Sequence, residues 1–314
     1  MVPTNETAES YLLLMVFSDF PWMKIALPVI FLTMYLVTIV GNLLLILLRR
    51  IDPRLHTPMY FFLSHLSFID ICFTTTIVPK MVSNYLTGDK SISFLACAAQ
   101  MFFSLALGAS ECILLAIMAF DRYVAICQPL RYYVIMSTTT CFLLAASCWT
   151  CSIVNSLFHT VFTFLWSFCK SKEIKHFFCE IQPLLRLSCA DTTIHEMWVF
   201  ATVVINVLCS FLLTLFSYAH IISTILKINS SEGKSKVFST CSSHLLVVII
   251  FYGTIVSTYL RPISSYNPER DRVITVLYTV AIPMCNPMIY SMRNKEVKGA
   301  MKKAMEKTWH ILTI

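Results

Sequence analysis

Seven stretches of this sequence are long, apolar and nearly uncharged. A membrane-spanning helix needs roughly 20 mostly apolar residues to cross a hydrocarbon layer about 30 Å thick. The stretches that meet this requirement are about 25–48, 58–79, 98–120, 140–162, 197–221, 237–260 and 272–291. The pattern therefore predicts an all-α membrane protein built as a bundle of seven transmembrane helices.

The second and seventh stretches carry the weakest signal. Asp70 interrupts the second, and Pro283, Asn286 and Pro287 interrupt the seventh. The linkers between all seven stretches are short and leave no room for a separate soluble domain, so we expect one domain over residues 1–314. The chain shows no internal repeat of the kind found in transporters.

Composition supports a membrane environment. Hydrophobic residues make up 57% of the chain and charged residues 13%, with a mean hydropathy of +0.72. A soluble domain carries roughly 25% charged residues, because its surface must be solvated. Lipid must therefore solvate much of this surface.

The net charge of +7 raises the question of nucleic-acid binding. If the N-terminus is extracellular, the Lys and Arg residues are modestly concentrated on the cytoplasmic side, and acidic residues balance those outside. This bias favours a cytoplasmic C-terminus. We expect the basic C-terminal segment to meet anionic lipid headgroups, and we expect no nucleic-acid partner.

The N-terminal region lacks a recognisable signal peptide. The first apolar run, Ile25 to Leu48, is too long for one and is followed by Arg49 and Arg50. It is expected to remain as a signal anchor. The sequon that begins at Asn5 then lies outside, where it is a candidate glycosylation site.

Cysteine positions fit the same topology. Of 13 cysteines, the four in segments assigned to the outside are Cys97, Cys169, Cys179 and Cys189. Disulfides persist in oxidising compartments, and four cysteines allow three pairings. Simple apolar packing is the alternative for a buried cysteine, but Cys179 stands in a polar run.

Polar residues are few inside the predicted helices, and they are costly there. They include Asn42, Asp70, Glu111 and Asn286. Two carboxyl groups at similar depth cannot both ionise unpaired in a medium of low dielectric constant. Asp70 and Glu111 either share a proton or bind a cation, unless the four residues form a hydrogen-bonded packing cluster.

The strongest local signal is the run from Met118 to Cys127. Asp121, Arg122 and Tyr123 stand where the third helix leaves the membrane. An adjacent acid and base at a helix end can form an ion pair that keeps this end closed until it is rearranged.

These motifs identify a resemblance to the rhodopsin-like G protein-coupled receptors, and among them to the odorant receptors. The resemblance covers nearly the whole chain. The matching runs are Gly41-Asn42, Leu55-His-Thr-Pro-Met-Tyr-Phe-Phe-Leu-Ser64, Met118-Ala-Phe-Asp-Arg-Tyr-Val-Ala-Ile-Cys127, Lys236-Val-Phe-Ser-Thr-Cys-Ser-Ser-His-Leu245 and Pro283-Met-Cys-Asn-Pro-Met-Ile-Tyr-Ser-Met-Arg-Asn294. The departures from the family pattern, at Phe120, Val237, Cys285 and Met292, keep an apolar character.

The resemblance implies a function in the plasma membrane. A small volatile odorant would bind among the outer halves of helices three, five, six and seven. The receptor would then activate a stimulatory, olfactory-type heterotrimeric G protein and raise cyclic AMP. The resemblance implies no cofactor other than a candidate sodium ion at Asp70 and Glu111.

The resemblance also assigns roles to individual residues. Cys97 would bridge to Cys179, and Cys169 to Cys189. Asp121 and Arg122 would form the inner lock, with Tyr218 and Tyr290 as switch tyrosines. The remaining residues expected in coupling and switching are Tyr123, Asn286 and Pro287.

Helical spacing points to a ligand pocket. A volatile ligand favours an apolar cavity with one or two polar anchors. The residues that share a face on the third, fifth and sixth helices are Met101, Ser104, Leu105 and Gly108, then Thr202, Val203 and Asn206, then Tyr252 and Tyr259. Ordinary packing is the alternative, because small residues also let membrane helices approach closely.

Two other classes of function fit the sequence less well. An enzyme would need a nucleophile motif or a metal-binding histidine cluster, but His65, His159 and His244 fall in different predicted helices. A channel or transporter would need a continuous polar path through the membrane, and the buried polar residues are too few to provide one.

Overall fold

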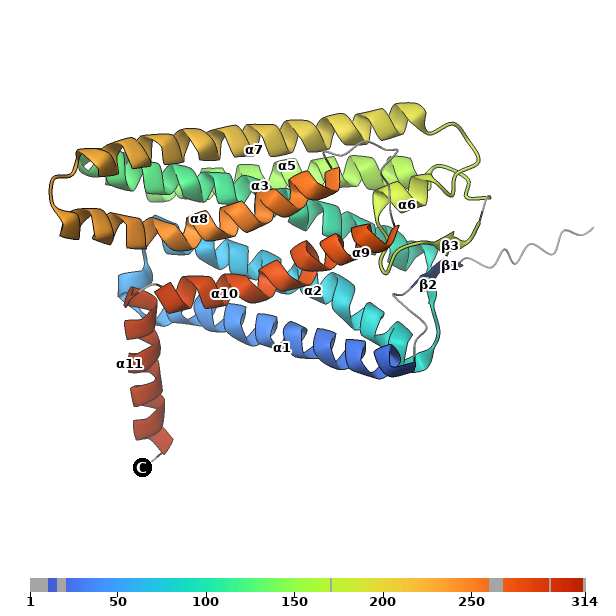
Figure 1. Ribbon diagram of the computed structural model, residues 1–314, viewed down its shortest axis with the longest axis horizontal. Helices are drawn as coiled ribbons and strands as arrows, with labels where there is room; N and C mark the ends of the chain where they lie inside the picture. The colour runs from blue at the N-terminus through green and yellow to red at the C-terminus, as the bar shows by residue number, and fades with distance from the viewer. Residues whose placement is uncertain (1–10, 16–20, 170, 260–267, 294, 313–314) are drawn as a thin grey trace, which may run out of the picture.

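The computed structural model describes residues 11–15, 21–169, 171–259, 268–293 and 295–312. Seven long helical segments lie side by side in this described part of the chain (Figure 1). They are α1 (Pro21–Ile51), α2 (Pro58–Thr87), α3 (Phe94–Cys127), α5 (Thr138–Phe164), α7 (Thr193–Lys227), α8 (Ser231–Tyr259) and a composite of α9 (Pro268–Val276), the π-helical segment η4 (Leu277–Ala281) and α10 (Ile282–Arg293). The predicted helical membrane bundle is confirmed.

Most of these helices are long and apolar enough to cross a membrane. Six of them meet that requirement within the described residues, and α8 contributes a shorter apolar segment, Cys241–Ser257. The surface of the bundle is itself apolar: Ile205 and Leu212 on α7 are 61% and 58% exposed. An extended apolar surface of this kind marks contact with membrane lipid or with another protein, and the spanning length of the helices favours lipid.

The helices extend beyond the predicted spans. The second span was expected at about 58–79, and α2 extends through Pro79 to Thr87. It ends at Gly88, whose φ of 75° is the left-handed conformation that commonly terminates a helix. At the start of α3, the Ser93 hydroxyl oxygen accepts a hydrogen bond from the Ala96 N–H at 3.2 Å.

A small sheet covers one end of the bundle, which we call the disulfide end. Strand β1 (Tyr11–Leu14) lies between β2 (Ser91–Ser93), to which it is antiparallel, and β3 (Glu173–Ile174), to which it is parallel. The sequence analysis did not predict these strands. The Leu12 and Leu14 side chains are fully buried beneath the sheet, next to the short helix α6 (Ile181–Leu185). The Asn5 sequon lies outside the described residues.

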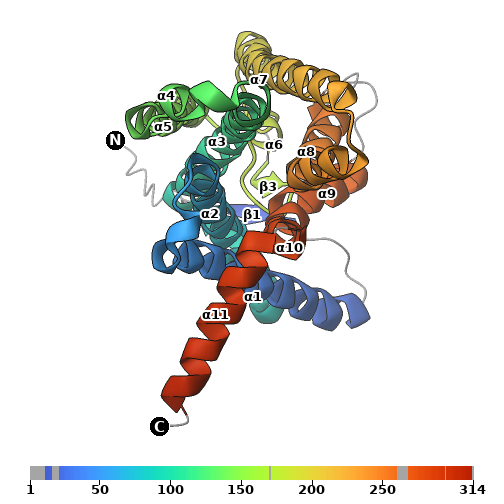
Figure 2. The same ribbon diagram turned by 90° about the vertical axis from the view of Figure 1, so that its left-hand side faces the viewer.

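The opposite end, which we call the Arg122 end, carries the short helices η1 (Pro53–Leu55), η2 (Pro129–Arg131) and α4 (Tyr132–Ile135). A further helix, α11 (Lys295–Leu312), projects sideways from the bundle here (Figures 1 and 2). Val297 and Ala300 are buried, whereas Lys298 and Lys302 are exposed. The basic C-terminal segment is therefore an amphipathic helix, which the sequence analysis did not predict.

Candidate functional site

A cavity of about 130 Å³ lies between α3, α5, α7, α8 and the segment that joins Phe178 to Ile181. Most of the residues predicted from helical spacing line it. On α3 these are Ser104, Leu105 and Gly108, and on α7 they are Thr202, Val203 and Asn206. Gly108 has open space beside it, since a Cβ atom at this position would meet no atom within 4 Å.

Two predicted residues lie outside the cavity lining. Met101 is fully buried in the apolar cluster at the disulfide end. The Tyr252 hydroxyl accepts a hydrogen bond from the Cys112 thiol at 3.9 Å, and its ring lies 5.4 Å from that of Phe211. The side chain of Tyr259, the third residue in question, lies outside the described residues.

On α8 the cavity is lined by Phe251 and Ile255, whereas the neighbouring Tyr252 is not part of the lining. One residue along a helix corresponds to a rotation of about 100°. Tyr252 is turned toward Cys112 of α3 and Phe211 of α7, because tertiary packing sets the rotation of α8.

Sequence reasoning missed several lining residues. Asn155 and His159 on α5 border the cavity, as do Phe178, Glu180 and Ile181 from the loop. The spacing of four between Asn155 and His159 places them on one helical face, and this was an available signal. The loop residues offered no comparable signal, because their position depends on a long-range crosslink.

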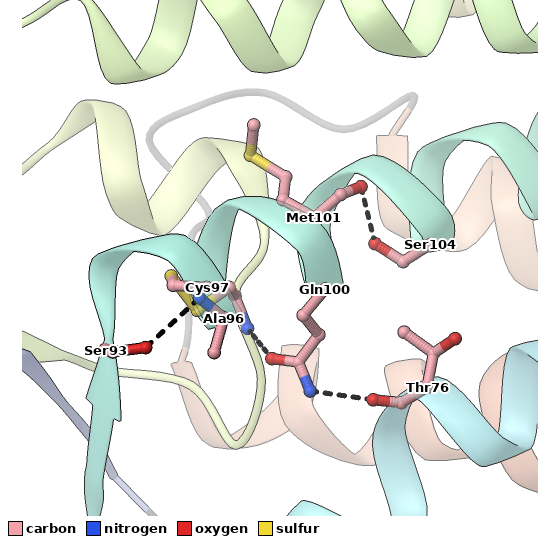
Figure 3. The surroundings of a disulfide bond; sticks show 8 residues. Thr76, Ser93, Ala96, Cys97, Gln100, Met101 and Ser104 are labelled. Carbon is pink, nitrogen blue, oxygen red and sulfur yellow. Dashed lines mark hydrogen bonds between the residues drawn. A yellow bond between two sulfur atoms is a disulfide. The ribbon is translucent and has the colours of Figure 1, made fainter.

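That crosslink is the disulfide between Cys97 and Cys179, whose Cα atoms are 5.4 Å apart. Figure 3 shows its surroundings. The Gln100 side chain accepts a hydrogen bond from the Cys179 N–H at 2.9 Å and donates one to the Thr76 carbonyl at 2.9 Å. The disulfide and this amide together hold the loop against α3 and α2, so that Phe178 and Glu180 reach the cavity.

The second disulfide joins Cys169 to Cys189, with Cα atoms 5.7 Å apart. An isolated antiparallel bridge between Phe168 and Ser188 lies beside it, and the Cys189 N–H donates to the Ser167 carbonyl at 3.2 Å. Both pairings agree with those that the family resemblance implied.

His176 is the most strongly perturbed group of the loop. Burial, together with the positive charge of Arg272, lowers the pKa of His176 to about 3. Its Nε2 atom lies 3.4 Å from a carboxylate oxygen of Glu180, a contact that favours the protonated ring. Burial is the larger effect, since only 2% of the His176 side chain is exposed. The imidazole is therefore neutral near pH 7.

The buried polar residues of the bundle core are partly paired. The Asn286 amide donates to both carboxyl oxygens of Asp70, at 3.0 and 3.2 Å, and the Asn42 amide donates to the Pro283 carbonyl at 3.2 Å. Glu111 borders the cavity, and its Oε1 atom is buried without a hydrogen-bond partner in the described structure. No cluster of three or more His, Cys, Asp or Glu side chains that could hold a metal ion occurs in the described part of the chain.

At the Arg122 end, Asp121 is fully buried and has two partners. The Arg122 guanidinium donates to its Oδ2 atom at 2.9 Å, and the Tyr132 hydroxyl donates to Oδ1 at 2.8 Å. Burial, followed by the charge of Asp121, raises the pKa of Tyr132 and keeps this hydroxyl protonated. Sequence reasoning anticipated the Asp121–Arg122 pair but missed Tyr132, which comes from α4.

The remaining predicted switch residues lie near this end. The Tyr218 hydroxyl is 2.7 Å from His244 Nδ1, and Tyr123 accepts a hydrogen bond from the Gln128 amide at 3.0 Å. The Tyr290 hydroxyl is buried and has no hydrogen-bond partner in the described structure. It is therefore available to bind another group if the helices rearrange.

Comparison with known proteins places this architecture in a family. A family model described as olfactory receptor matches residues 31–308. The chain belongs to the olfactory receptor family. Olfactory receptor 8U9 is 51% identical in Homo sapiens and 50% identical in Mus musculus, in each case over 96% of this chain, and the matches cover 98% and 96% of those receptors. Human olfactory receptor 1L4 is 50% identical over 95% of this chain and 96% of its own length.

Membership of the olfactory receptor family decides several of the sequence predictions. The chain is a multi-pass protein of the plasma membrane, and it is a receptor of a family that is not enzymatic. Odorants are the ligands of this family. The cavity between α3, α5, α7 and α8 is the candidate ligand site.

Proposed function

We propose that this olfactory receptor binds small, volatile, largely apolar molecules in the cavity and responds by activating a stimulatory, olfactory-type heterotrimeric G protein, which raises cyclic AMP. The observation that carries the proposal is the position of the cavity. Its lining includes Ser104 and Gly108 of α3, and the same helix carries Asp121 and Arg122 near its other end. A ligand that shifts α3 can therefore alter the Asp121–Arg122 contact.

Shape should set most of the affinity. Apolar burial contributes about 25 cal/mol per Å² before the cost of immobilising the ligand. A net hydrogen bond adds about 0.5–1.5 kcal/mol. Leu105 and Val203 offer only apolar area, while Asn206 offers an amide. Polar anchors should consequently rank ligands of similar size rather than determine whether they bind.

Coupling would require opening of the Arg122 end. The pair of Asp121 and Arg122 is largely buried, with 0% and 13% of the two side chains exposed. Separating the ions costs several kcal/mol unless each finds a new partner. An incoming G protein segment could supply a partner for Arg122, and Tyr218 and Tyr290 lie in the adjacent helices.

We place the disulfide end outside the cell and the Arg122 end in the cytoplasm. The disulfides support this orientation, because they form in oxidising compartments. The amphipathic helix α11 would then meet anionic lipid at the inner leaflet. The wild-type receptor should carry a glycan that a glycosidase can remove, and the Asn5→Gln variant should lack this glycan. Glycosylation of a tag at the C-terminus would contradict the orientation.

A sodium ion is part of the same proposal. Asp70 and Glu111 would supply the carboxyl oxygens, and the unpartnered Oε1 atom of Glu111 supports such a role. Thermal stability of the purified receptor should rise with sodium but not with an equal concentration of choline. Glu111→Gln should remove this difference.

Cyclic-AMP reporter assays of cells expressing the receptor test the function. A panel of volatile ligands should include agonists, and Arg122→Ala should abolish their response at unchanged surface density. Arg50→Ala is the matched control, because Arg50 is an exposed arginine at the same end of α1. Normal signalling by Arg122→Ala would contradict the coupling role, and ligand-dependent ion flux in a reconstituted bilayer would favour a channel.

A further inference from the structure

One wall of the cavity is formed by α5 and α7, and two side-chain contacts between them establish their alignment. The rings of Phe162 and His195 are 6.4 Å apart, and the His159 Nε2 atom lies 2.9 Å from the Thr202 hydroxyl. The later residue of α5, Phe162, contacts the earlier residue of α7, His195, and the earlier residue of α5 contacts the later one of α7. The two helices therefore run antiparallel where they meet.

The His159–Thr202 pair closes the part of the wall nearer the disulfide end. The Thr202 hydroxyl donates its proton to the Val199 carbonyl at 3.0 Å. With its proton on this carbonyl, the Thr202 hydroxyl accepts its second hydrogen bond from His159 in the tautomer that carries Nε2–H. The Thr202 hydroxyl proton is therefore not free to bind a ligand. On α3, the Ser104 hydroxyl likewise donates to the Met101 carbonyl at 3.0 Å.

Two amides lie one helical turn deeper. Asn155 precedes His159 by four residues on α5, and Asn206 follows Thr202 by four on α7. Four residues rise about 6 Å along a helix. Because the helices are antiparallel, both steps lead the same distance away from the His159–Thr202 contact. Asn155 and Asn206 therefore face the cavity at a similar depth.

Both amides are open to the cavity. Each is half-buried and lines it, and neither makes a side-chain hydrogen bond to any described residue. A primary amide carries two N–H donors and one carbonyl acceptor. A pair of unused amides inside a largely apolar cavity can thus bind a polar group that a ligand brings in.

The charge of the cavity restricts that group. Glu111 and Glu180 line the same space, and its described lining contains no lysine or arginine. A carboxylate ligand would find no lysine or arginine of the described lining to pair with, and it would lie beside two carboxyl groups. Burying an unpaired charge costs far more than burying a hydrogen-bonded neutral oxygen.

We propose that Asn155 and Asn206 form an amide clamp that holds an uncharged oxygen of the ligand, a hydroxyl or a carbonyl, and that the cavity rejects carboxylates. The inference rests on the proposed function, because it names the ligand chemistry of the same cavity. Amide N–H groups from both helices donate to the ligand oxygen. For an alcohol, an amide carbonyl also accepts the hydroxyl proton.

The test uses ligands of matched carbon number: an alcohol, an aldehyde, a carboxylate and a hydrocarbon. Binding is measured as thermal stabilisation of the purified receptor, and signalling as cyclic AMP. The variants are Asn155→Leu, Asn206→Leu and the double variant, since leucine has the same number and branching of non-hydrogen side-chain atoms as asparagine without its hydrogen-bonding groups. The hydrocarbon is the control within each variant, because no amide can hydrogen-bond it.

Each single variant should weaken alcohol and aldehyde binding about 2- to 12-fold and leave hydrocarbon binding unchanged or improved. The double variant should lose less than the product of the two single losses, because both amides bind the same oxygen. A larger loss for the alcohol than for the aldehyde would show that an amide also accepts the hydroxyl proton.

Equal losses of binding affinity for the oxygenated ligands and the hydrocarbon in both single variants would overturn the clamp. Preferential binding of the carboxylate to the wild-type receptor would also overturn it. Absence of binding by every oxygenated ligand would overturn it as well. A wild-type receptor that binds alcohols but gives no cyclic AMP would instead contradict the proposed coupling and leave the clamp supported.

Discussion

The contact between Gly41 of α1 and Pro287 of α10 leaves no room for a side chain. A Cβ atom at position 41 would lie 2.9 Å from Pro287 Cγ and 3.1 Å from Pro287 Cβ. Carbon atoms pack best at about 3.5–4.0 Å. The Gly41→Ala substitution must therefore push the two helices apart by roughly 0.5–1 Å, because the pyrrolidine ring cannot rotate away.

Overpacking of this kind typically costs about 1–3 kcal/mol. The effect should extend beyond stability, because Pro287 directly follows Asn286, whose amide binds Asp70. Displacing this part of α10 stretches the two hydrogen bonds from the Asn286 amide to Asp70. We therefore expect Gly41→Ala to lower both the stability of the receptor and the amplitude of its agonist response.

The matched control is Gly253→Ala on α8. Gly253 is exposed within a helix, and a Cβ atom there would meet no atom within 4 Å. Alanine should favour the helix over glycine by about 0.5–1 kcal/mol. The same chemical change should thus act in opposite directions at the two positions.

Thermal unfolding of the two variants in detergent, read by a thiol-reactive or intrinsic fluorescence signal, provides the measurement. The midpoint of Gly41→Ala should fall by a few degrees, on the order of 2–4 °C per kcal/mol, and that of Gly253→Ala should stay level or rise. Equal midpoints for the two variants would refute the close helix contact that we infer at Gly41.

Three further substitutions test separate parts of the structure. Tyr132→Phe removes one of the two partners of Asp121 and should raise basal cyclic AMP several-fold at equal surface density. Gln100→Leu leaves the buried Cys179 N–H unpaired, which costs about 1–3 kcal/mol, and should reduce surface delivery while the disulfide still forms in peptide maps. The pKa of His176 falls from 6.5 to about 3 on folding. Its contribution to stability is complete above about pH 6.5 and falls by about 1.4 kcal/mol per pH unit toward pH 3, so His176→Gln should flatten the acid limb of the thermal-stability profile.

Much of the helical bundle could be predicted from the sequence, because an apolar run of sufficient length has few alternatives in a membrane protein. The residues at which the helices end were harder to predict from the sequence. The second span was expected at about 58–79, and α2 continues past Pro79 to Thr87, since a membrane helix tolerates a proline when neighbouring groups satisfy its backbone. Helix α11 escaped prediction because its polar face breaks up the apolar run that identified the other helices.

The sheet at the disulfide end had no local signature. Four residues from Tyr11 pair with segments near residues 92 and 173, and the order β2-β1-β3 arises only when the loops are in place. Strands this short do not show a repeated alternation of polar and apolar residues. The pairing depends on the Cys97–Cys179 crosslink and on burial of Leu12 and Leu14. Both are features of the tertiary structure and leave no signal in the local sequence.

The cavity illustrates the difference between a helical face and its orientation. Spacings of three and four correctly grouped Ser104 with Gly108 and Thr202 with Asn206, because each pair must lie on one side of its helix. The same rule grouped Asn155 with His159, but it could not tell which neighbour those side chains meet. Only the antiparallel contact of α5 with α7 places Asn155 and Asn206 at a similar depth in the cavity. A polar pair on each helix, unremarkable by itself, then becomes a site where two amides can bind one oxygen atom.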